Sequence, residues 1–496
     1  KMTFGDATGG DLQIYHDGNH NYIKDVGTGN FELQTNGVIK LQKGATEYLA
    51  QFNVDGAVQL YYDNSQKLAT TSTGVDITGT AVTDGLTVAG NVSVDGGTIK
   101  LDGNYPNGVN NVALGNAALD TASGANGYSV AIGTNALTAM TTGGSNTAVG
   151  AGAAPAITSG ANNVALGTDA LGSATGANFN TVVGSAALYN STANYNTVMG
   201  RQAAYSNTTG EQNVALGGLA FFTNSTGSYN VALGMEALTQ NTTASNNTAV
   251  GFRAGYSNTT GSVTAFGQRA SFSNTTGADN VAVGIQALYS NSTGNFNTAI
   301  GHTALNANTT GNVNTAVGYR ALLTNTTGYE NTAIGPNSLK VNTTGLYNTA
   351  VGSTSLFSNT TGNNNTGVGY RSLYQNTTGA QNTGLGQDSF YSNTTGNYNV
   401  GIGFMCLYNN TTANDNTAVG YQAGYANTTG TANSFYGKQS GYNTSTGNYN
   451  AASGNSSLYS NTTGSYNTAF GVNSLFSNTT ATYNTHIGYQ AGFSNT

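Results

Sequence analysis

The side chains in this sequence best suited to bind a metal ion are two histidines that lie close together, His16 and His20. Imidazole nitrogens are common zinc ligands, but here only Asp17-Gly18-Asn19 separates the pair. Histidines on either side of a Gly-Asn turn are usually solvated turn residues, so we expect no metal and no cofactor. The single cysteine, Cys406, has no disulfide partner and is expected to be a buried substitute for alanine.

The most frequent modifiable motif is Asn-x-Thr, the acceptor sequence for N-linked glycans. It has two interpretations. In the first, the Asn and Thr side chains make turn and ladder hydrogen bonds. In the second, exposed asparagines carry glycans that coat the protein. The candidate acceptors are Asn207, Asn258, Asn274, Asn308, Asn325, Asn342, Asn359, Asn376, Asn393, Asn427, Asn461 and Asn478.

Motifs of common enzyme classes are absent from the sequence. It contains no Gly-x-Ser-x-Gly elbow, no Walker loop and no cluster of paired carboxylates. Calcium-binding repeats need an aspartate at every turn, whereas residues 105–496 contain five scattered aspartates: Asp120, Asp169, Asp279, Asp388 and Asp415. We therefore expect no enzymatic activity and no structural calcium.

The elements that must position these residues are set by a repeat of 17 residues. One copy runs from Asn314 to Glu330, and the next begins at Asn331. The glycine that closes the phrase Asn-Thr-Ala-Val-Gly marks 23 copies, spaced by 17 residues except for one step of 18 and two of 16. The two shorter steps fall in the corner segments near residues 190–196 and 261–267. So short and regular a period indicates a solenoid with one coil per copy.

Each coil is predicted to contain two short strands. The first precedes the closing glycine, as in Thr315-Ala316-Val317, where the small middle residue predicts a buried face. The second follows the glycine, as in Ser372-Leu373-Tyr374, and is expected to carry an internal leucine ladder and an aromatic ladder. Asn-Thr-Thr-Gly then closes the coil as a corner, in which Asn and Gly tolerate a left-handed backbone.

The region before the repeats has a different pattern. Its short alternating runs have the length and period of strands, and so thin a region would expose one apolar face per strand, which favours three chains wrapped around one another. We predict an all-β chain with a β-rich fibrous region at 1–104 and a parallel β-solenoid of 23 repeats at 105–496. The predicted N-terminal strands are Leu12–Tyr15, Phe31–Leu33, Val38–Leu41, Ala57–Tyr62, Val75–Thr78, Leu86–Val88 and Val92–Val94.

Charge is concentrated at the N-terminal end of the chain. Residues 1–102 hold 18 of the 33 charged side chains, and the remaining residues carry 7 basic and 8 acidic groups. A nearly neutral array offers no electrostatic footprint for nucleic acid or an anionic membrane surface. No run of 18 apolar residues is present, so we expect no membrane insertion. The chain stops at Thr496 partway through a copy, and we interpret it as part of a longer protein.

The repeat resembles segments of two known families. The phrase Asn-Thr-Ala-Val-Gly-x-x-Ala, as at 416–423, resembles the head repeat of trimeric autotransporter adhesins, whose heads are parallel β-rolls of three chains side by side. The likeness covers eight positions of each coil, and the return segment here is longer. The whole chain is similar to tail-fibre and virion-appendage proteins of bacteriophages, which combine segments like 11–18 and 75–80 with arrays of this kind. This resemblance implies a homotrimeric fibre.

We therefore expect a structural fibre protein on a virion tail, outside the cell, that forms the shaft presenting a host-recognition tip. Its expected partners are two further copies of itself and a host cell-surface receptor or glycan. The alternative is a cellular surface adhesin or a glycosylated extracellular filament subunit. A polysaccharide-cleaving tailspike is disfavoured because such an enzyme needs carboxylates grouped in a groove.

Overall fold

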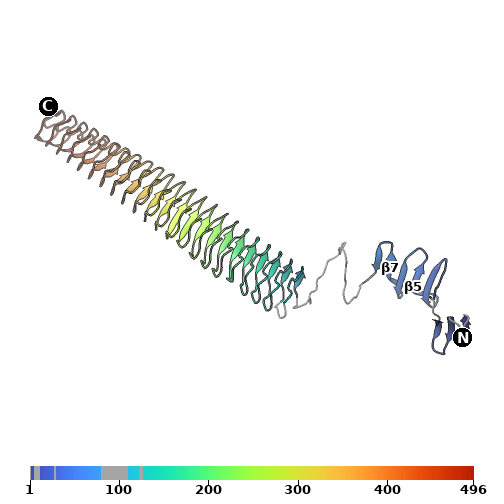
Figure 1. The fold of residues 1–496 in the computed structure, drawn as a ribbon. Coiled ribbons are helices and arrows are strands. Elements are labelled where there is room, and N and C mark those ends of the chain that lie inside the picture. The colour runs from blue at the N-terminus through green and yellow to red at the C-terminus, as the bar shows by residue number, and fades with distance from the viewer. Residues whose placement is uncertain (1, 5–11, 27–29, 80–109, 122–126, 496) are drawn as a thin grey trace. The chain divides into compact units, whose positions relative to one another are not determined.

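The computed structural model describes residues 2–4, 12–26, 30–79, 110–121 and 127–495. The chain divides into two compact units, Lys1–Ile99 and Lys100–Thr496. The predicted boundary near residue 104 and the predicted strands Leu86–Val88 and Val92–Val94 lie outside the described residues. Both units are all-β, as predicted (Figure 1).

The first unit contains two antiparallel sheets. The smaller sheet joins β1 (Met2–Phe4), β2 (Leu12–His16) and β3 (Asn21–Asp25). The larger one is a meander in chain order of β4 (Val38–Lys43), β5 (Glu47–Asn53), β6 (Val58–Tyr62), β7 (Ser65–Thr71) and β8 (Gly74–Ile77). Turn residues at positive φ, such as Asp63 and Asn64 between β6 and β7, allow these tight connections.

The larger sheet has one apolar and one polar face. Residues directly opposite in neighbouring strands share a face, and one such row runs through the whole sheet as Leu41, Ala50, Leu60, Leu68 and Ile77. The side chains of Leu41, Leu60 and Ile77 are 53%, 43% and 47% exposed. This row, together with Ile39, Phe52 and Val58, is called the apolar face below.

The polar face of the same sheet is held together by amide side chains. Gln59 accepts a hydrogen bond from the Tyr61 hydroxyl at 3.0 Å, and its Nε2 donates to Gln66 at 2.8 Å. Gln51 donates to Asn53 at 2.8 Å. The sheet thus has one polar side linked by side-chain hydrogen bonds and one apolar side on which Leu41, Leu60 and Ile77 are exposed.

The sequence located four of these eight strands. The predictions at residues 12–15, 38–41, 57–62 and 75–78 are confirmed within one or two residues. The prediction at Phe31–Leu33 is wrong, because this stretch belongs to no strand of the described structure. Strands β1, β3, β5 and β7 were missed. In β5 and β7 the apolar alternation is interrupted, because the pairing of β5 with β4 shifts register after Leu41 and that of β7 with β6 shifts after Leu60.

The second unit is a parallel β-solenoid in which 23 strands follow one another along the array (Figure 1). Each strand pairs with the next in parallel register, for example Thr315 with Thr332, Ala316 with Ala333 and Val317 with Ile334. The strands are β9 (Val112–Leu114), β10 (Val130–Ile132), β11 (Thr147–Val149), β12 (Val164–Leu166), β13 (Thr181–Val183), β14 (Thr197–Met199), β15 (Val214–Leu216), β16 (Val231–Leu233), β17 (Thr248–Val250), β18 (Val263–Phe266), β19 (Asn280–Val283), β20 (Thr298–Ile300), β21 (Thr315–Val317), β22 (Thr332–Ile334), β23 (Thr349–Val351), β24 (Thr366–Val368), β25 (Thr383–Leu385), β26 (Val400–Ile402), β27 (Thr417–Val419), β28 (Ser434–Tyr436), β29 (Ala451–Ser453), β30 (Thr468–Phe470) and β31 (Thr485–Ile487).

Positions in a coil are numbered here from its closing glycine as position 0, so that in the coil of Gly318 the residue Leu322 is at position +4 and Glu330 at +12. The second predicted strand, after the glycine, is wrong. Arg320, Leu322 and Glu330 have φ of 55°, 51° and 54°, in the left-handed region. A backbone that returns to positive φ at alternate residues cannot form a β-strand.

Hydrogen bonds to the neighbouring coils compensate for this costly backbone. The Arg320 N–H donates to His302 in the preceding coil at 3.1 Å, and the Leu322 N–H donates to Ser338 in the following coil at 3.0 Å. A left-handed residue other than glycine costs about 1–2 kcal/mol, so a single coil would not hold this shape. The turn segment is stable only between two copies of itself.

The two glycines of a coil have different roles. The closing glycine needs its freedom: Gly318 has a φ of 135°, and a Cβ there would lie 2.7 Å from the carbonyl of Gly335. The corner glycine Gly328 does not have a left-handed φ, contrary to the prediction. It is glycine because a Cβ would lie 2.4 Å from Oδ1 of Asn325 and 2.5 Å from the carbonyl oxygen of Gly345.

The core of the array consists of ladders in which one residue type repeats from coil to coil. Small residues such as Ala316 and Ala321 and the predicted leucine ladder, including Leu322, are fully buried. The predicted aromatic ladder is also present at position +5, although it lies on turns. Nine rings at this position, from Phe357 to Phe493, stack with centroids 5.0 to 5.4 Å apart.

Candidate functional site

The two histidines singled out in the sequence lie in the hairpin between β2 and β3. His16 ends β2, His20 precedes β3, and both are exposed. Between them, the Asp17 carboxylate accepts the N–H groups of Asn19 at 2.9 Å and His20 at 2.8 Å. These two backbone bonds lower the pKa of Asp17. The arrangement is that of solvated turn residues, and no three His, Cys, Asp or Glu side chains gather in the described part of the chain.

Cys406 lies in the solenoid core at position +3 and is fully buried, as predicted. Its Sγ donates to the carbonyl oxygens of Ala418 at 3.1 Å and Ala423 at 3.4 Å. The Ser355 hydroxyl uses the equivalent carbonyls, Gly367 at 2.9 Å and Ser372 at 3.3 Å. Burial raises the pKa of the Cys406 thiol to about 12. The thiol is a packing group in this site and not a nucleophile.

All twelve candidate glycan acceptors, Asn207 to Asn478, occupy position +7 and are at most 1% exposed. In Asn325, Nδ2 donates to Asn308 Oδ1 and to the Gly328 carbonyl, both at 2.9 Å. These are ladder hydrogen bonds of the kind described in the first interpretation. A glycan must replace one of the two hydrogens on Nδ2, so its attachment requires that the coil be open.

A second buried asparagine ladder runs at position +13. The Asn331 N–H and Nδ2 both donate to Asn314 Oδ1, at 3.0 and 3.2 Å, and Nδ2 also donates to the Gly345 carbonyl at 2.8 Å. The sequence marks both ladders through the repeated Asn-Thr pairs. What it does not mark is that both asparagines point inward.

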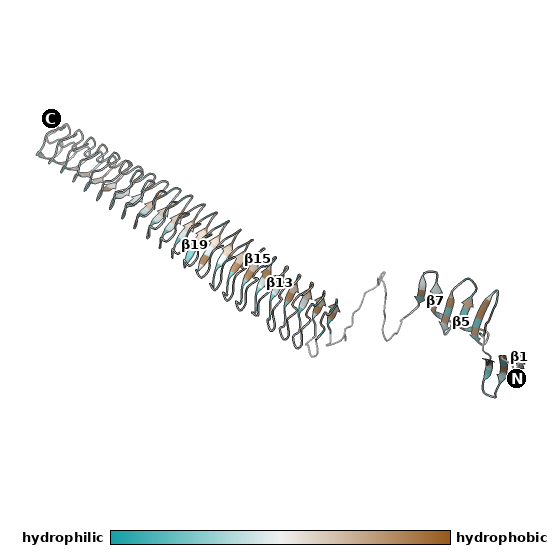
Figure 2. Cartoon of the chain, viewed as in Figure 1, coloured by the Kyte–Doolittle hydropathy of each residue, from teal (hydrophilic) through white to brown (hydrophobic). Residues whose placement is uncertain are grey.

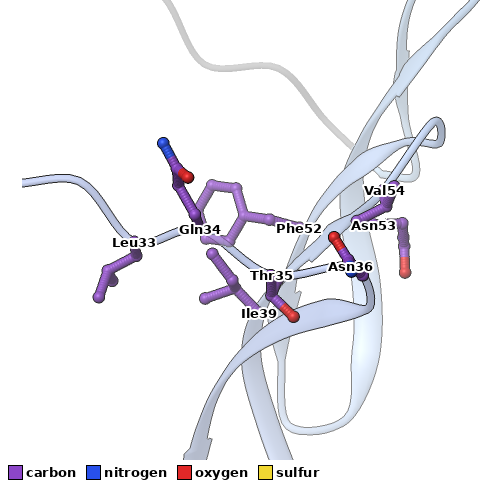
Figure 3. A pocket seen from close by; sticks show the side chains of 8 residues that line it. All are labelled: Leu33, Gln34, Thr35, Asn36, Ile39, Phe52, Asn53 and Val54. Atoms are coloured by element: carbon purple, nitrogen blue, oxygen red, sulfur yellow. The ribbon is translucent and has the colours of Figure 1, made fainter.

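A cavity of about 720 Å³ lies beside the apolar face of the first unit. Figure 3 shows Ile39 and Phe52 side by side on the sheet, with Leu33 and Gln34 on the segment that passes next to them. The lining contains no ionisable side chain and is about evenly divided between apolar and uncharged polar residues. It is lined by Leu33, Gln34, Thr35, Asn36, Ile39, Phe52, Asn53 and Val54.

The solenoid has an outward face formed by its strands, called the strand face below. In each strand the middle side chain points inward and the two outer ones, at positions +14 and +16, point outward, as in the half-buried, buried, half-buried pattern of β21. Position +14 is usually Thr or Val, and position +16 is apolar in nearly every coil. Ile300, Ile334 and Ile402 are 39%, 41% and 38% exposed. An apolar stripe therefore runs along the array, as the brown strands β13 and β15 illustrate in Figure 2.

The strand face carries no formal charge. None of the strands β9 to β31 contains Asp, Glu, Lys or Arg. The charged side chains lie on the turns, where some pair between adjacent coils: Arg371 Nε is 2.7 Å from Asp388 Oδ1, and Arg253 pairs with Glu236. A face from which charge is excluded along its whole length can be desolvated at low cost.

Comparison with known proteins adds no assignment to this geometry. No protein-family model matches the chain, and no curated protein or solved structure matches it. In the residues that the structure describes, no helix has the length and apolar character needed to cross a bilayer. The strand face, which runs through strands β9 to β31, and the apolar face of the first unit are the surfaces considered below.

Proposed function

We propose that this chain is the shaft of a homotrimeric fibre, of the kind found on phage tails, which holds a host-recognition tip away from the particle. The observation that carries the proposal is the uncharged apolar stripe on the strand face. A long exposed apolar stripe of this kind commonly marks an interaction surface. A second and a third copy of the same chain offer matching stripes with the same repeat distance.

The extent of the strand face is sufficient for a stable interface. The 23 strands make 22 steps of about 4.8 Å, or about 105 Å, and three residues span about 10 Å. The face thus measures roughly 1,000 Å², compared with the roughly 800 Å² per partner of a typical stable interface.

Irregularities of the stripe favour a partner of complementary shape. At Ser453 the side chain at position +16 is small, while Tyr436 and Phe470 in the adjacent coils are 46% and 59% exposed. A cavity of about 130 Å³ lies between them. A side chain from a neighbouring chain fits a depression of this size.

The apolar face of the first unit supports the same proposal. Leu41, Leu60 and Ile77 of its row are exposed, although they lie on the apolar side of a five-stranded sheet. Three chains that face inward would cover it, as the sequence led us to expect. The glycosylated-filament alternative is weaker, because the twelve candidate acceptors lie in the core of the coils.

The oligomeric state of the purified chain tests the proposal. We expect light scattering to give three times the chain mass of 50.3 kDa, and electron micrographs to show a fibre with threefold symmetry. Replacing Ile300 and Ile334 by Lys would place charge on the strand face and is expected to release monomers. A matched control replaces Thr310 and Thr344 by Lys. These are exposed corner residues that also lie two coils apart. A wild-type monomer at micromolar concentration would contradict the proposal.

The location of the fibre is a separate question with its own test. Antibodies against the coil array are expected to label the tails of virions in electron micrographs. Labelling of a cell surface without virions would instead support the adhesin alternative.

A further inference from the structure

The coil between Gly251 and Gly267 lacks one residue, and the structure shows which one. Gly261 and Ser262 are followed directly by Val263, which is 2% exposed and occupies the place of the ladder asparagine at position +13. The preceding coil has Ser245-Asn246-Asn247 here, and the following coil has Ala278-Asp279-Asn280. The short coil therefore lacks the exposed residue at position +12.

The missing residue leaves a cavity of about 390 Å³ at the corner of the array, called the notch below. The other short coil, between Gly184 and Gly200, keeps its ladder intact, since the Asn196 N–H still donates to Asn180 at 2.9 Å. The notch thus results from the position of the deletion and not from coil length alone. It is lined by Ser245, Asn246, Ser262, Val263, Thr264, Asp279, Asn280 and Val281.

The deletion leaves hydrogen-bonding groups without partners around the notch. In a regular coil the N–H at position +12 donates to the preceding coil, as Glu330 does to Asn312 at 3.0 Å. The following, short coil offers Ser245 no such donor. Neither the backbone C=O nor the backbone N–H of Ser245 has a partner in the described part of the chain. The side-chain amide of Asn246 also makes no hydrogen bond there. Asp279 uses Oδ1 to accept from the Ser262 hydroxyl at 2.8 Å, which leaves Oδ2 available.

Two exposed aromatic rings lie at equal distances on either side of the notch. Tyr229 and Phe296 are both at position +12, two coils before and two coils after the short one, and are 59% and 60% exposed. Where rings at this position are adjacent, they stack face to face, as Tyr449 and Tyr466 do at 5.0 Å. A ring at this position therefore turns its face along the array. The coil neighbours of Tyr229 and Phe296 on the notch side are Asn246 and Asp279, which leave those faces without a ring partner.

We propose that the notch is a binding site for a neutral oligosaccharide. Sugar hydroxyls both donate and accept hydrogen bonds, and Ser245, Asn246 and Asp279 offer donors and acceptors together. The aromatic rings pack against the apolar faces of sugar rings. The carboxylate of Asp279 disfavours an anionic ligand. Four coil steps of about 4.8 Å place the two rings about 19 Å apart, so several linked sugars are needed to reach both.

This inference does not depend on the fibre proposal, because one chain contains every group of the site. The test measures binding of the full chain to four uncharged hexasaccharides, built from β-linked glucose, α-linked glucose, mannose and N-acetylglucosamine, by saturation-transfer NMR and calorimetry. We expect at least one of them to bind at one site per chain with submillimolar affinity.

Three variants locate the site. Inserting Asn after Ser262 together with Val263→Asn restores a coil of 17 residues, fills the notch and extends the ladder, so binding should disappear while the fold is retained. Tyr229→Ser and Phe296→Ser should each weaken binding about tenfold. The matched control is Tyr398→Ser, at the same position in a regular coil and also 60% exposed, which should leave binding unchanged.

The proposal is overturned if none of the hexasaccharides binds at millimolar concentration. It is also overturned if the filled-notch variant, shown to be folded by circular dichroism, binds as well as the wild type. A third contrary result would be calcium binding at Asp279 in the absence of sugar, which would make the notch a cation site.

Discussion

The five-stranded sheet and the coil array are both made of short strands, yet they bury their apolar side chains in different ways. Leu60 in the sheet is 43% exposed, whereas Leu322 in the array is fully buried. The amide network around Gln59 lies on the surface of a single layer, while Asn325 bonds to its counterparts inside the coils. A coil is covered by the next coil of the same chain, but within the described residues no second layer covers the sheet. Because each coil covers its neighbour, the array buries its apolar side chains along its axis without a second layer.

The largest loss of stability is expected from substitution of a closing glycine in the array. A Cβ on Gly217, at φ 139°, would lie 2.5 Å from the carbonyl of Gly234, whereas a Cβ on its neighbour Gly218 meets nothing within 4 Å. Gly217→Ala should cost about 4 kcal/mol or more, and Gly218→Ala less than about 1 kcal/mol. Hydrogen exchange of the surrounding amides measures both. Equal protection in the two variants would contradict close coil contact.

The second test compares a leucine from each region. Leu322→Ala removes a fully buried side chain and should cost about 3 kcal/mol. Leu60→Ala in a monomeric preparation should cost about 1 kcal/mol or less, because that side chain remains partly hydrated. Denaturant titrations that report each unit separately give the two values. If both substitutions cost the same in the monomer, the apolar face of the sheet is covered within one chain.

The third test compares amide side chains. Asn325→Ala leaves the Gly328 carbonyl and the neighbouring amides without partners in the core, at a cost of about 2 kcal/mol. Gln59→Ala breaks bonds that water can replace and should cost less than about 1 kcal/mol. Thermal unfolding followed by circular dichroism distinguishes the two. A cost below about 1 kcal/mol for Asn325→Ala would mean that the ladder bonds contribute little.

The smallest effect on stability at neutral pH is expected for Cys406→Ala, because the thiol only fills a place that alanine holds in other coils. Its titration should be more revealing. The folded thiol has a pKa of about 12 and the unfolded one about 8.5. The folded state therefore keeps its proton longer, and the stability contributed by this group falls as pH rises between these values. Iodoacetamide at pH 8 should leave the folded chain unmodified and should modify the unfolded chain.

The sequence predicted the solenoid, the coil length and the first strand of each coil because these depend on a strict period. It did not predict the left-handed turn that replaces the second strand. A signal was present: glycine takes the place of leucine at Gly255, Gly424 and Gly441, where φ is 59° to 62°. An exchange of a core leucine for glycine indicates a left-handed backbone, which glycine adopts without strain. Period alone cannot reveal this, since leucine at the same position is forced into that conformation by its neighbours.

The candidate sites were less accessible to sequence analysis. Asn-x-Thr marks a glycan acceptor only when the asparagine is exposed. Whether the side chain points inward or outward depends on the turn geometry, which was not predicted from the sequence. The strand face could be inferred from the alternation in Thr315-Ala316-Val317. The notch could not be inferred from the sequence, because it depends on one residue being missing between Ser262 and Val263. Coil length alone does not reveal it, since the other coil of 16 residues keeps its ladder intact.

The parallel register of the strands has one more consequence. Since the regular 17-residue coils present matching upper and lower surfaces, one of them can be added or removed with little change to the cross-section or to the contacts of those that remain. Reach then changes in fixed increments of about 4.8 Å per 17 residues. The number of coils therefore sets the length of the array, and duplication of a coil would lengthen it without altering the segments at its two ends.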